Sequence, residues 1–273
     1  MNVTLPEKEK VEKRRISIYI ISVIVCILAI IIVIGVQILG DDIINNLFGI
    51  NKLIKRTEQE EAELKSNFET ILDNKIDNKE NDEIIYTSYK KEEKNNNYEI
   101  NVNLPYINIK NKEVEKFNEE VKNTFETKAE DVIKSEGENI VYTVKYKAHI
   151  ENNILSVIIY SDLKQETTAQ RIIFRTFNYN IEEKKQIGLE DVIKIYDLKE
   201  SSVQNKIDTD IKEEQRKADD LKQLGYNVFS RDLESEIYKI KNIEEFFIYN
   251  NNIYIIFAYG NNNITSEMDL VII

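Results

Sequence analysis

The stretch Ile154–Leu163, ILSVIIYSDL, decides the fold of this chain. Its apolar residues fall on both faces of an extended chain, which is typical of a central strand in a sheet covered on each side. The turn residues Glu151-Asn152-Asn153 precede it, and a polar stretch around Gln165 follows it. We therefore predict a central strand joined by short turns to a neighbour on either side.

The segments that flank this strand alternate with the period of two of half-buried strands. One face of the preceding segment carries Ile140, Tyr142, Val144, Tyr146, Ala148 and Ile150, and the other carries Thr143, Lys145, Lys147 and His149. Residues 171–181 alternate more loosely. The three segments together predict an antiparallel meander.

A hairpin and a helix are predicted upstream. Residues 84–89 and 98–104 have strand patterns on either side of an Asn-rich turn, and Pro105 is expected to end the second strand. A helix is predicted over about 112–134, with Asn111 as its N-cap. Its buried face consists of residues at helical spacing, namely Val114, Phe117, Val121, Phe125 and Val132.

Downstream, helical segments precede a second set of strands. A helix is predicted to open at 189–193 and to continue over 198–224, with Gly225 as its stop. Strands are predicted at 246–249, 253–259 and 269–273. Because helices and strands are segregated along the chain, the predicted class is α+β, an antiparallel sheet with two main helices packed on it.

Ahead of this region lies Ile16–Leu39, ISIYIISVIVCILAIIIVIGVQIL, without one charged side chain. A helix that crosses hydrocarbon needs about 20 apolar residues, so the run predicts a single transmembrane helix. A cleaved signal peptide is the alternative, but its apolar core is shorter and ends at an A-x-A-like site. Basic residues before the span and Asp41-Asp42 after it predict a cytoplasmic tail, 1–15, and an exterior for the rest.

Residues 40–82 are predicted to form a helical stalk and a linker. Its apolar residues follow heptad spacing, interrupted by Thr57 and Glu61. Two interpretations stay open: a stalk that forms a weak homodimer, and a solvated helix with one apolar stripe. The polar stretch 73–82, DNKIDNKEND, is the expected linker into the folded part.

Charge and composition exclude some classes of partner. The chain carries a formal charge of −12, and 32 basic against 46 acidic residues beyond the tail leave −14 there. Nucleic acid is therefore not an expected partner. An acidic exterior would attract a basic partner, although it commonly serves solubility alone. The one cysteine, Cys26, lies within the predicted span and allows no internal disulfide.

No catalytic signature accompanies this architecture. The chain has one histidine and lacks the P-loop, dinucleotide-binding and zinc-protease motifs. His149 shares a face with Lys145 and Lys147, and we expect it to be solvated rather than to act as a base. The sequence predicts no catalytic residue, no cofactor, no metal and no enzymatic activity, although carboxylate pairs remain possible because they need only spatial closeness.

Two stretches resemble known families. The run Tyr98–Ile109, YEINVNLPYINI, with the following Phe117-Asn118 and Val121, resembles the small domain beside PdaC-type polysaccharide deacetylases. From about Phe174 onward the order is similar to the C-terminal domain of the RsiV family of membrane-anchored anti-sigma factors. It comprises a strand, Ile187–Val192, a long helix, FFIYNNNIYIIFAYG and a last strand. The resemblance implies a PdaC-like α+β domain at 83–165 and an RsiV-type α+β domain at 166–273, forming one globular unit.

The resemblance also implies a function, although this chain differs from the family in two respects. RsiV-like proteins bind lysozyme outside the cell, which triggers their proteolysis and frees a sigma factor. Here the tail 1–15 is too short to bury much surface on a sigma factor. The loop within 258–267 keeps Tyr259 but lacks the proline of the family's lysozyme-contacting loop. Tyr259, Asn261, Asn262 and Asn263 are the candidate contact residues, and an ordinary loop between strands is the alternative.

Two functional hypotheses follow. The first is a single-pass membrane protein whose exterior recognises lysozyme or another cell-wall-related ligand. The second is a non-catalytic accessory protein that binds peptidoglycan. Association with a soluble protein should saturate and weaken with salt, whereas a wall-binding module should be retained by insoluble peptidoglycan.

Overall fold

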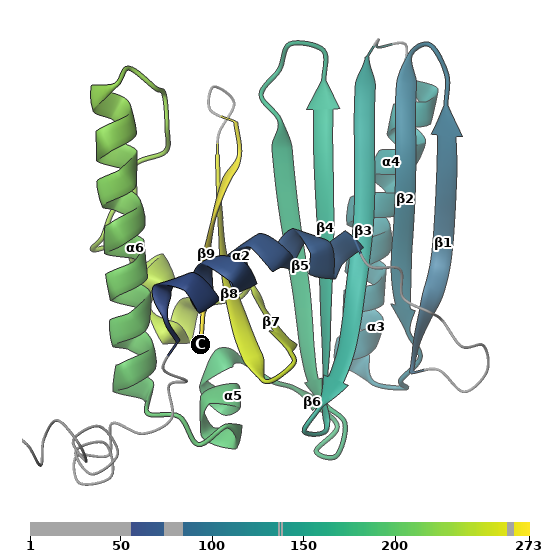
Figure 1. The fold of residues 1–273 in the computed structure, drawn as a ribbon. Coiled ribbons are helices and arrows are strands. Elements are labelled where there is room, and N and C mark those ends of the chain that lie inside the picture. Colours follow the sequence, from purple (N-terminus) through teal and green to yellow (C-terminus); the bar gives the residue numbers. More distant parts are fainter. Residues whose placement is uncertain (1–55, 74–83, 136, 138, 261–264) are drawn as a thin grey trace, which may run out of the picture. The chain divides into compact units, whose positions relative to one another are not determined.

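Two β-sheets and the helices packed on them organise the folded part of the chain (Figure 1). The computed structural model describes residues 56–73, 84–135, 137, 139–260 and 265–273. All of them lie within one unit, Leu53–Ile273. Its regular elements in chain order are α2 (Glu58–Asp73), β1 (Ile85–Lys94), β2 (Tyr98–Ile107), α3 (Lys112–Val121), the π-helical turn η1 (Lys122–Glu126), α4 (Thr127–Lys134), β3 (Ile140–Glu151), β4 (Ile154–Gln165), β5 (Arg171–Asn180), β6 (Lys185–Gln186), α5 (Leu189–Ile195), α6 (Glu200–Gln223), the short 3-10 helices η2 (Glu236–Tyr238) and η3 (Ile240–Asn242), β7 (Phe246–Tyr249), β8 (Asn252–Tyr259) and β9 (Glu267–Ile272).

The larger sheet contains β1 to β6 in chain order. The predicted α+β class and the meander of β3, β4 and β5 are confirmed. The expectation of a wholly antiparallel sheet is wrong for one pair, because β2 and β3 run parallel. Their connection passes through α3, η1 and α4, and such a crossover returns the chain in its original direction. The sheet is therefore mixed.

Helices α3 and α4 cover the back of this sheet (Figure 1). As predicted, Asn111 caps α3, since its side chain accepts a hydrogen bond from the backbone N–H of Glu113 at 2.8 Å. Asn118 on α3 brackets the backbone of Ile107 at the end of β2. It accepts from the Ile107 N–H at 3.0 Å and donates to the Ile107 carbonyl at 2.9 Å. These bonds hold the helix in register with the strand.

Strand β2 does not end at Pro105, contrary to the prediction. Pro105 pairs with Thr87 of the edge strand β1, and the register shifts there between Thr87 and Tyr89. Proline cannot donate to a β-ladder and is found in strands at edges and bulges. The irregular pairing with β1 accommodates the missing donor, so the strand continues to Ile107.

The C-terminal strands form a second sheet, in the order β7-β8-β9, and do not extend the first. Helices α5 and α6 pack against this second sheet and share its hydrophobic core. The one predicted sheet with two helices is thus two sheets, each with its own helices. Strand β5 pairs with β4 along its length, so the first sheet crosses the expected domain boundary at 165/166.

A small buried polar network joins the two sheets. The Ser156 hydroxyl on β4 donates to Asn178 Oδ1 on β5 at 2.6 Å, and it accepts from the Ile248 N–H of β7 at 2.9 Å. Asn178 Nδ2 in turn donates to the Phe246 carbonyl at 2.8 Å. Because these bonds join side chains on one face of the first sheet to the backbone of β7, they fix the position at which the second sheet packs.

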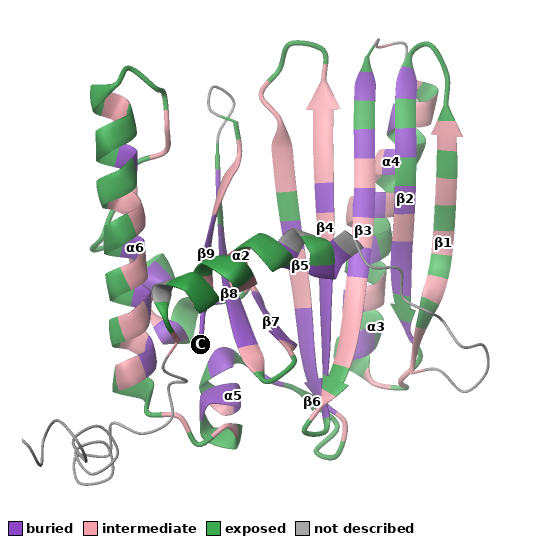
Figure 2. Cartoon of the chain, in the orientation of Figure 1, coloured by how far each residue is buried: buried purple, intermediate pink, exposed green. Residues whose placement is uncertain are grey.

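Helix α2 lies across the front of both sheets, where Figure 2 shows its outer face exposed. On its inner face Phe68, Ile71 and Leu72 are buried, in a cluster with side chains of β4, β5 and all three strands of the second sheet. The structure therefore differs from the expected stalk over the part that it describes. Its apolar stripe packs within the folded unit, where it is neither solvated nor free to pair with a second copy.

The polar residues that interrupt the heptad pattern have structural roles. Thr57 starts α2, since its hydroxyl accepts from the Glu60 N–H at 3.2 Å and Glu60 accepts from the Thr57 N–H at 2.7 Å. This is a capping box. Glu61 accepts from Lys206 of α6 at 2.9 Å. The pattern is therefore that of a capped, docked helix.

The predictions for the N-terminal region lie outside the described part of the chain. They are the tail 1–15, the span 16–39, the first part of the stalk (40–55) and the linker 74–82. Within the described ranges, no helix is both long and apolar enough to cross a membrane.

Candidate functional site

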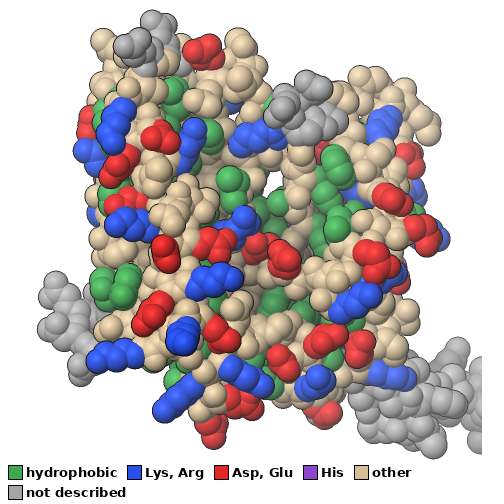
Figure 3. Space-filling view, turned by 180° about the vertical axis from the view of Figure 1, so that it is seen from behind, with side chains coloured by type: hydrophobic (Ala, Val, Ile, Leu, Met, Phe, Trp, Pro, Cys, Tyr) green, Lys and Arg blue, Asp and Glu red, His purple; other side chains and the backbone are tan. Residues whose placement is uncertain are grey.

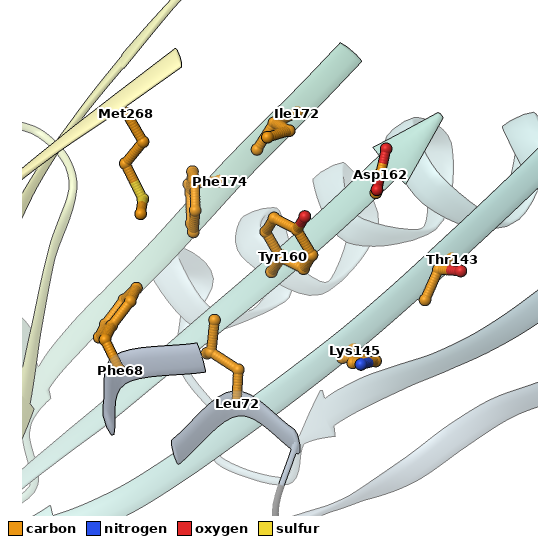
Figure 4. A pocket seen from close by; sticks show the side chains of 9 residues that line it. All are labelled: Phe68, Leu72, Thr143, Lys145, Tyr160, Asp162, Ile172, Phe174 and Met268. Carbon is orange, nitrogen blue, oxygen red and sulfur yellow. The ribbon is translucent and has the colours of Figure 1, made fainter. Parts of the chain in front are cut away.

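A groove opens on the front of the larger sheet, beside α2 (Figure 4). Its volume is about 280 Å³. Five elements contribute to it: helix α2, strands β3, β4 and β5 of the larger sheet, and the edge strand β9 of the second sheet. The lining residues are Phe68, Leu72, Thr143, Lys145, Tyr160, Asp162, Ile172, Phe174 and Met268.

The floor of the groove consists of two cross-strand rows. In one row Lys145 of β3 lies opposite Tyr160 of β4, which lies opposite Phe174 of β5. In the next row Thr143, Asp162 and Ile172 are opposite one another in the same way. Residues two apart on a strand face the same side of a sheet. Both rows therefore face the groove, with aromatic and polar side chains as neighbours.

Helix α2 and strand β9 form the walls. Phe68 stacks on Tyr254 with ring centroids 5.4 Å apart, which places its other edge beside the groove. Ahead of the helix, Arg56 donates to the carbonyls of Ile272 and Ile273, each at 3.2 Å, and to the side chain of Asn252. The start of α2 is thereby attached to the C-terminal end of the second sheet.

A second hollow, of about 500 Å³, adjoins the groove through Ile172, which lines both. Its other lining residues are Arg171, Phe229, Ala258, Tyr259, Gly260 and Ser266. The space-filling view from behind shows an opening near the middle of the molecule, and acidic and basic side chains are interspersed on this face (Figure 3). The two hollows together make an elongated and open site.

Charged groups in the groove are few and of both signs. Gln170 donates to Oδ2 of Asp162 at 2.7 Å. The other carboxylate oxygen, Oδ1, is buried and has no hydrogen-bond partner among the described residues. Lys145 supplies a cation on the neighbouring strand. In the adjoining hollow, Arg171 Nη1 donates to the Ser266 hydroxyl at 3.4 Å.

Tyr259, the predicted contact residue, has only 8% of its surface exposed. Its hydroxyl donates to Oδ2 of Asp269 at 3.0 Å and lies 3.0 Å from the hydroxyl of Tyr238. Its ring stacks on Phe229, with centroids 4.5 Å apart. Burial, the hydrogen bond with Tyr238 and the charge of Asp269 raise the pKa of Tyr259 far above its usual range.

The contact role of Tyr259 stays a prediction, but the structure places most of this residue inside the protein. Its polar end is occupied inside the protein, and its ring contributes only one edge to the second hollow. Asn261, Asn262 and Asn263, the other predicted contact residues, lie outside the described residues.

The alternation pattern predicted a solvated side chain for His149, and the structure shows it only partly exposed. Its side chain is 27% exposed, Nε2 lies 3.1 Å from Oε2 of Glu151, and its ring lies 4.8 Å from that of Tyr249. Glu151 also accepts from the Tyr196 hydroxyl at 2.6 Å and from the Asn251 N–H at 3.0 Å. Burial acts to raise the pKa of Glu151, but these hydrogen bonds outweigh it and lower the pKa. The cluster ties the β3–β4 turn to the β7–β8 turn.

The groove was missed by reasoning from sequence. A signal was present, because Tyr160 and Asp162 follow the all-apolar part of the central strand with a spacing of two, on the same face as Thr143 and Lys145. That signal does not show which helix covers the face. Within the described residues, no group of His, Cys, Asp and Glu side chains is arranged to hold a metal ion.

No protein-family model matches the chain, and no curated protein matches it in sequence. Among solved structures, it is similar to a member of the DUF3298 family (BF2082) from Bacteroides fragilis NCTC 9343. The identity is 14%, the TM-score is 0.33, and the match covers 64% of this chain and 80% of that one. A likeness at this level leaves the family of the present chain open.

Proposed function

We propose that this chain is a membrane-anchored, extracytoplasmic binding and sensing protein, and that the groove beside α2 takes its ligand. The supporting observation is the groove itself. Aromatic and apolar side chains from α2, β4, β5 and β9 meet there with a small number of polar groups, among them Lys145 and Asp162. Sites for small ligands and for parts of larger ones commonly have this composition.

The proposed ligand is related to the cell wall, either a wall component or a wall-degrading protein such as lysozyme. The sequence resemblance to the RsiV-type exterior supports this choice. The charge of −14 beyond the tail also supports it, because an acidic surface accelerates association with a basic protein. The apolar run 16–39 and its basic N-terminal flank support a single span with the folded part outside.

One observation favours the second candidate, a non-catalytic accessory protein that binds peptidoglycan. Tyr259, which the resemblance assigns to the lysozyme contact, is hydrogen-bonded within the protein. A loop anchored by such a residue has less freedom to insert its aromatic side chain into the cleft of a partner. The groove does not depend on Tyr259 for its floor and suits a wall ligand equally.

Titration of the full chain in lipid nanodiscs with a basic lysozyme, at low and at moderate salt, tests the first candidate. Co-sedimentation with insoluble peptidoglycan tests the second. Ile172→Glu places a charge in the groove, whereas Ile173→Glu changes the next residue of the same strand, which is 39% exposed outside it. We expect Ile172→Glu alone to weaken binding. Equal effects of the two variants would contradict the groove as the site, and failure of both ligands to bind would contradict the proposed ligands.

A further inference from the structure

The chemistry of the groove narrows the class of ligand beyond the proposed function, on which this inference rests. We infer that the groove beside α2 binds a neutral oligosaccharide whose sugar rings carry acetamido groups. A ring lies on Tyr160, whose own ring packs against the buried Phe174, and the polar substituents meet Lys145 and Asp162.

The aromatic part of the floor offers a flat surface for a sugar ring at Tyr160, with the buried Phe174 packed beside it. Tyr160 and Phe174 are direct neighbours across β4 and β5, with ring centroids 5.2 Å apart and planes tilted by 46°. One face of a pyranose ring presents C–H groups, and these are attracted to the negative face of an aromatic ring. Tyr160 is only half-buried, so its ring is accessible from the groove.

The polar groups flank this aromatic surface on two sides. Lys145 lies directly opposite Tyr160 on β3, and Asp162 is two residues further along β4 on the same face. An acetamido group combines an N–H donor, a carbonyl acceptor and a methyl group. Asp162, with its unpartnered oxygen Oδ1, accepts from the N–H, and Lys145 donates to the carbonyl. The methyl group packs against Leu72 on the α2 wall.

Other ligand classes fit less well. An acyl chain would cover Asp162 and Lys145 without hydrogen-bonding them, which is unfavourable because polar groups lose their water without gaining a partner. A peptide cannot add as a strand at the middle of the floor, because β4 is paired with β3 and β5 along its length. A polyanion would be repelled by the net charge of −12 on the chain. Within the groove, the positive charge of Lys145 is balanced by the carboxylate of Asp162. A neutral ligand with its own donors and acceptors matches the groove's balance of charge.

The extent of the site favours a chain of sugars over a single ring. The groove of about 280 Å³ shares its lining residue Ile172 with the hollow of about 500 Å³, which is also lined by the stacked aromatic pair Phe229 and Tyr259. The occupant is therefore several units long and runs from Lys145 toward Gly260.

Calorimetric titration of the full chain in nanodiscs with N-acetylchitohexaose tests the inference, with cellohexaose as the probe that lacks acetamido groups. We expect the first to bind at least about tenfold more tightly than the second, a difference of about 1.4 kcal/mol. Tyr160→Ala is expected to weaken binding about tenfold, whereas Tyr86→Ala, at a 40%-exposed tyrosine of β1, should leave it unchanged. Asp162→Asn keeps the volume of the side chain and gives a second groove variant if Tyr160→Ala unfolds.

Saturation-transfer NMR gives an independent readout, since saturation of the aromatic protons should pass first to the ring C–H protons of the sugar. Equal affinity for the two hexasaccharides, insensitivity to both groove variants, or no binding of N-acetylchitohexaose would overturn the inference. If neither sugar binds while lysozyme or peptidoglycan binding depends on Ile172, the groove remains the ligand site and only the oligosaccharide assignment fails. If no ligand responds to any groove variant, the proposed function fails with it.

Discussion

Arg231 and Asp269 form a buried bidentate ion pair, with Nε–Oδ2 and Nη2–Oδ1 distances of 2.7 Å each. Their side chains are 6% and 3% exposed. Arg231 belongs to the segment that follows α6, and Asp269 lies on β9. The pair therefore attaches that segment to the second sheet, directly beneath Tyr259, whose ring lies 5.4 Å from the guanidinium carbon.

Removing one partner of this pair should be costly. Arg231→Met leaves the Asp269 carboxylate buried without its cation, and we predict a loss of about 3–5 kcal/mol in the free energy of unfolding. Urea denaturation measures it. Arg216→Met is the matched control, because Arg216 is 61% exposed although it also contacts two carboxylates. A loss for Arg231→Met no larger than that of the control would contradict the structural role of the pair.

The buried hydroxyl of Tyr259 gives a smaller effect. Tyr259→Phe keeps the stacked ring but removes the hydrogen bond to Asp269, and we predict a loss of about 1–2 kcal/mol in the free energy of unfolding. Tyr226→Phe, at a residue 62% exposed, should leave the melting temperature unchanged. An unchanged melting temperature for Tyr259→Phe would contradict the hydrogen bond between the Tyr259 hydroxyl and Asp269.

The docking of α2 depends on one aromatic side chain. Phe68 is 1% exposed, and Phe68→Ala should weaken the packing of the helix by about 3–5 kcal/mol. Because the helix lies at the N-terminal end of the described unit, we expect faster hydrogen exchange in 58–72 and little change in β3 and β4. Asn67→Ala, at the exposed neighbour, is the control. Uniform acceleration across the domain would show instead that α2 does not unfold locally.

The same helix should respond to acid. Burial acts to raise the pKa of Glu61, but the hydrogen bond and positive charge of Lys206 outweigh it and lower the pKa below its ordinary value of 4.5. A carboxyl with a lowered folded-state pKa stabilises the fold above its unfolded pKa, and this contribution is lost as the pH falls through the folded value. We therefore predict weaker protection of the α2 amides at about pH 3.5 than at pH 6.

Glu61→Gln isolates this effect. Asp210 shares Lys206 with Glu61, and burial raises its pKa, so its own contribution to stability changes with pH in the opposite direction. In Glu61→Gln, the protection of the α2 amides should lose the part of its acid dependence that Glu61 supplies. An unchanged pH profile of α2 protection in Glu61→Gln would exclude Glu61 as its source.

The last prediction concerns the buried polar network that joins the two sheets. Asn178 is 3% exposed and links Ser156 to the Phe246 carbonyl. Asn178→Ala leaves both groups buried without their partner, and we predict a loss of about 1–3 kcal/mol in the free energy of unfolding. Asn101→Ala, at an exposed position of β2, is the control in the same urea titration. Equal midpoints for the two variants would mean that the network does not couple the sheets.

Local patterns predicted most of the elements but not their arrangement. The alternation in 140–150 and the apolar run 154–163 placed β3 and β4, and Asn111 was identified as a cap. The same patterns could not distinguish one sheet from two, because an apolar strand face does not identify the face that covers it. The parallel pairing of β2 with β3 also depends on where α3 and α4 pack.

The candidate site illustrates the same limit. Tyr259 was predicted from the resemblance to the family's lysozyme-contacting loop, but the side chains that bury it lie 10 to 30 residues away, on β9, η2 and the segment after α6. The groove residues Phe68, Tyr160 and Met268 come from three distant parts of the chain. No local pattern relates such residues.

The sequence by itself determined the α+β class, the positions of most strands and helices, and the acidic charge, because these depend on periodicity and composition within short windows. Tertiary structure decided that α2 docks rather than forming a free stalk, that Tyr259 is buried, and that Tyr160 and Asp162 face a groove. The physical reason is that burial of one apolar face depends on which other face covers it, and that pairing is settled by packing over the whole unit.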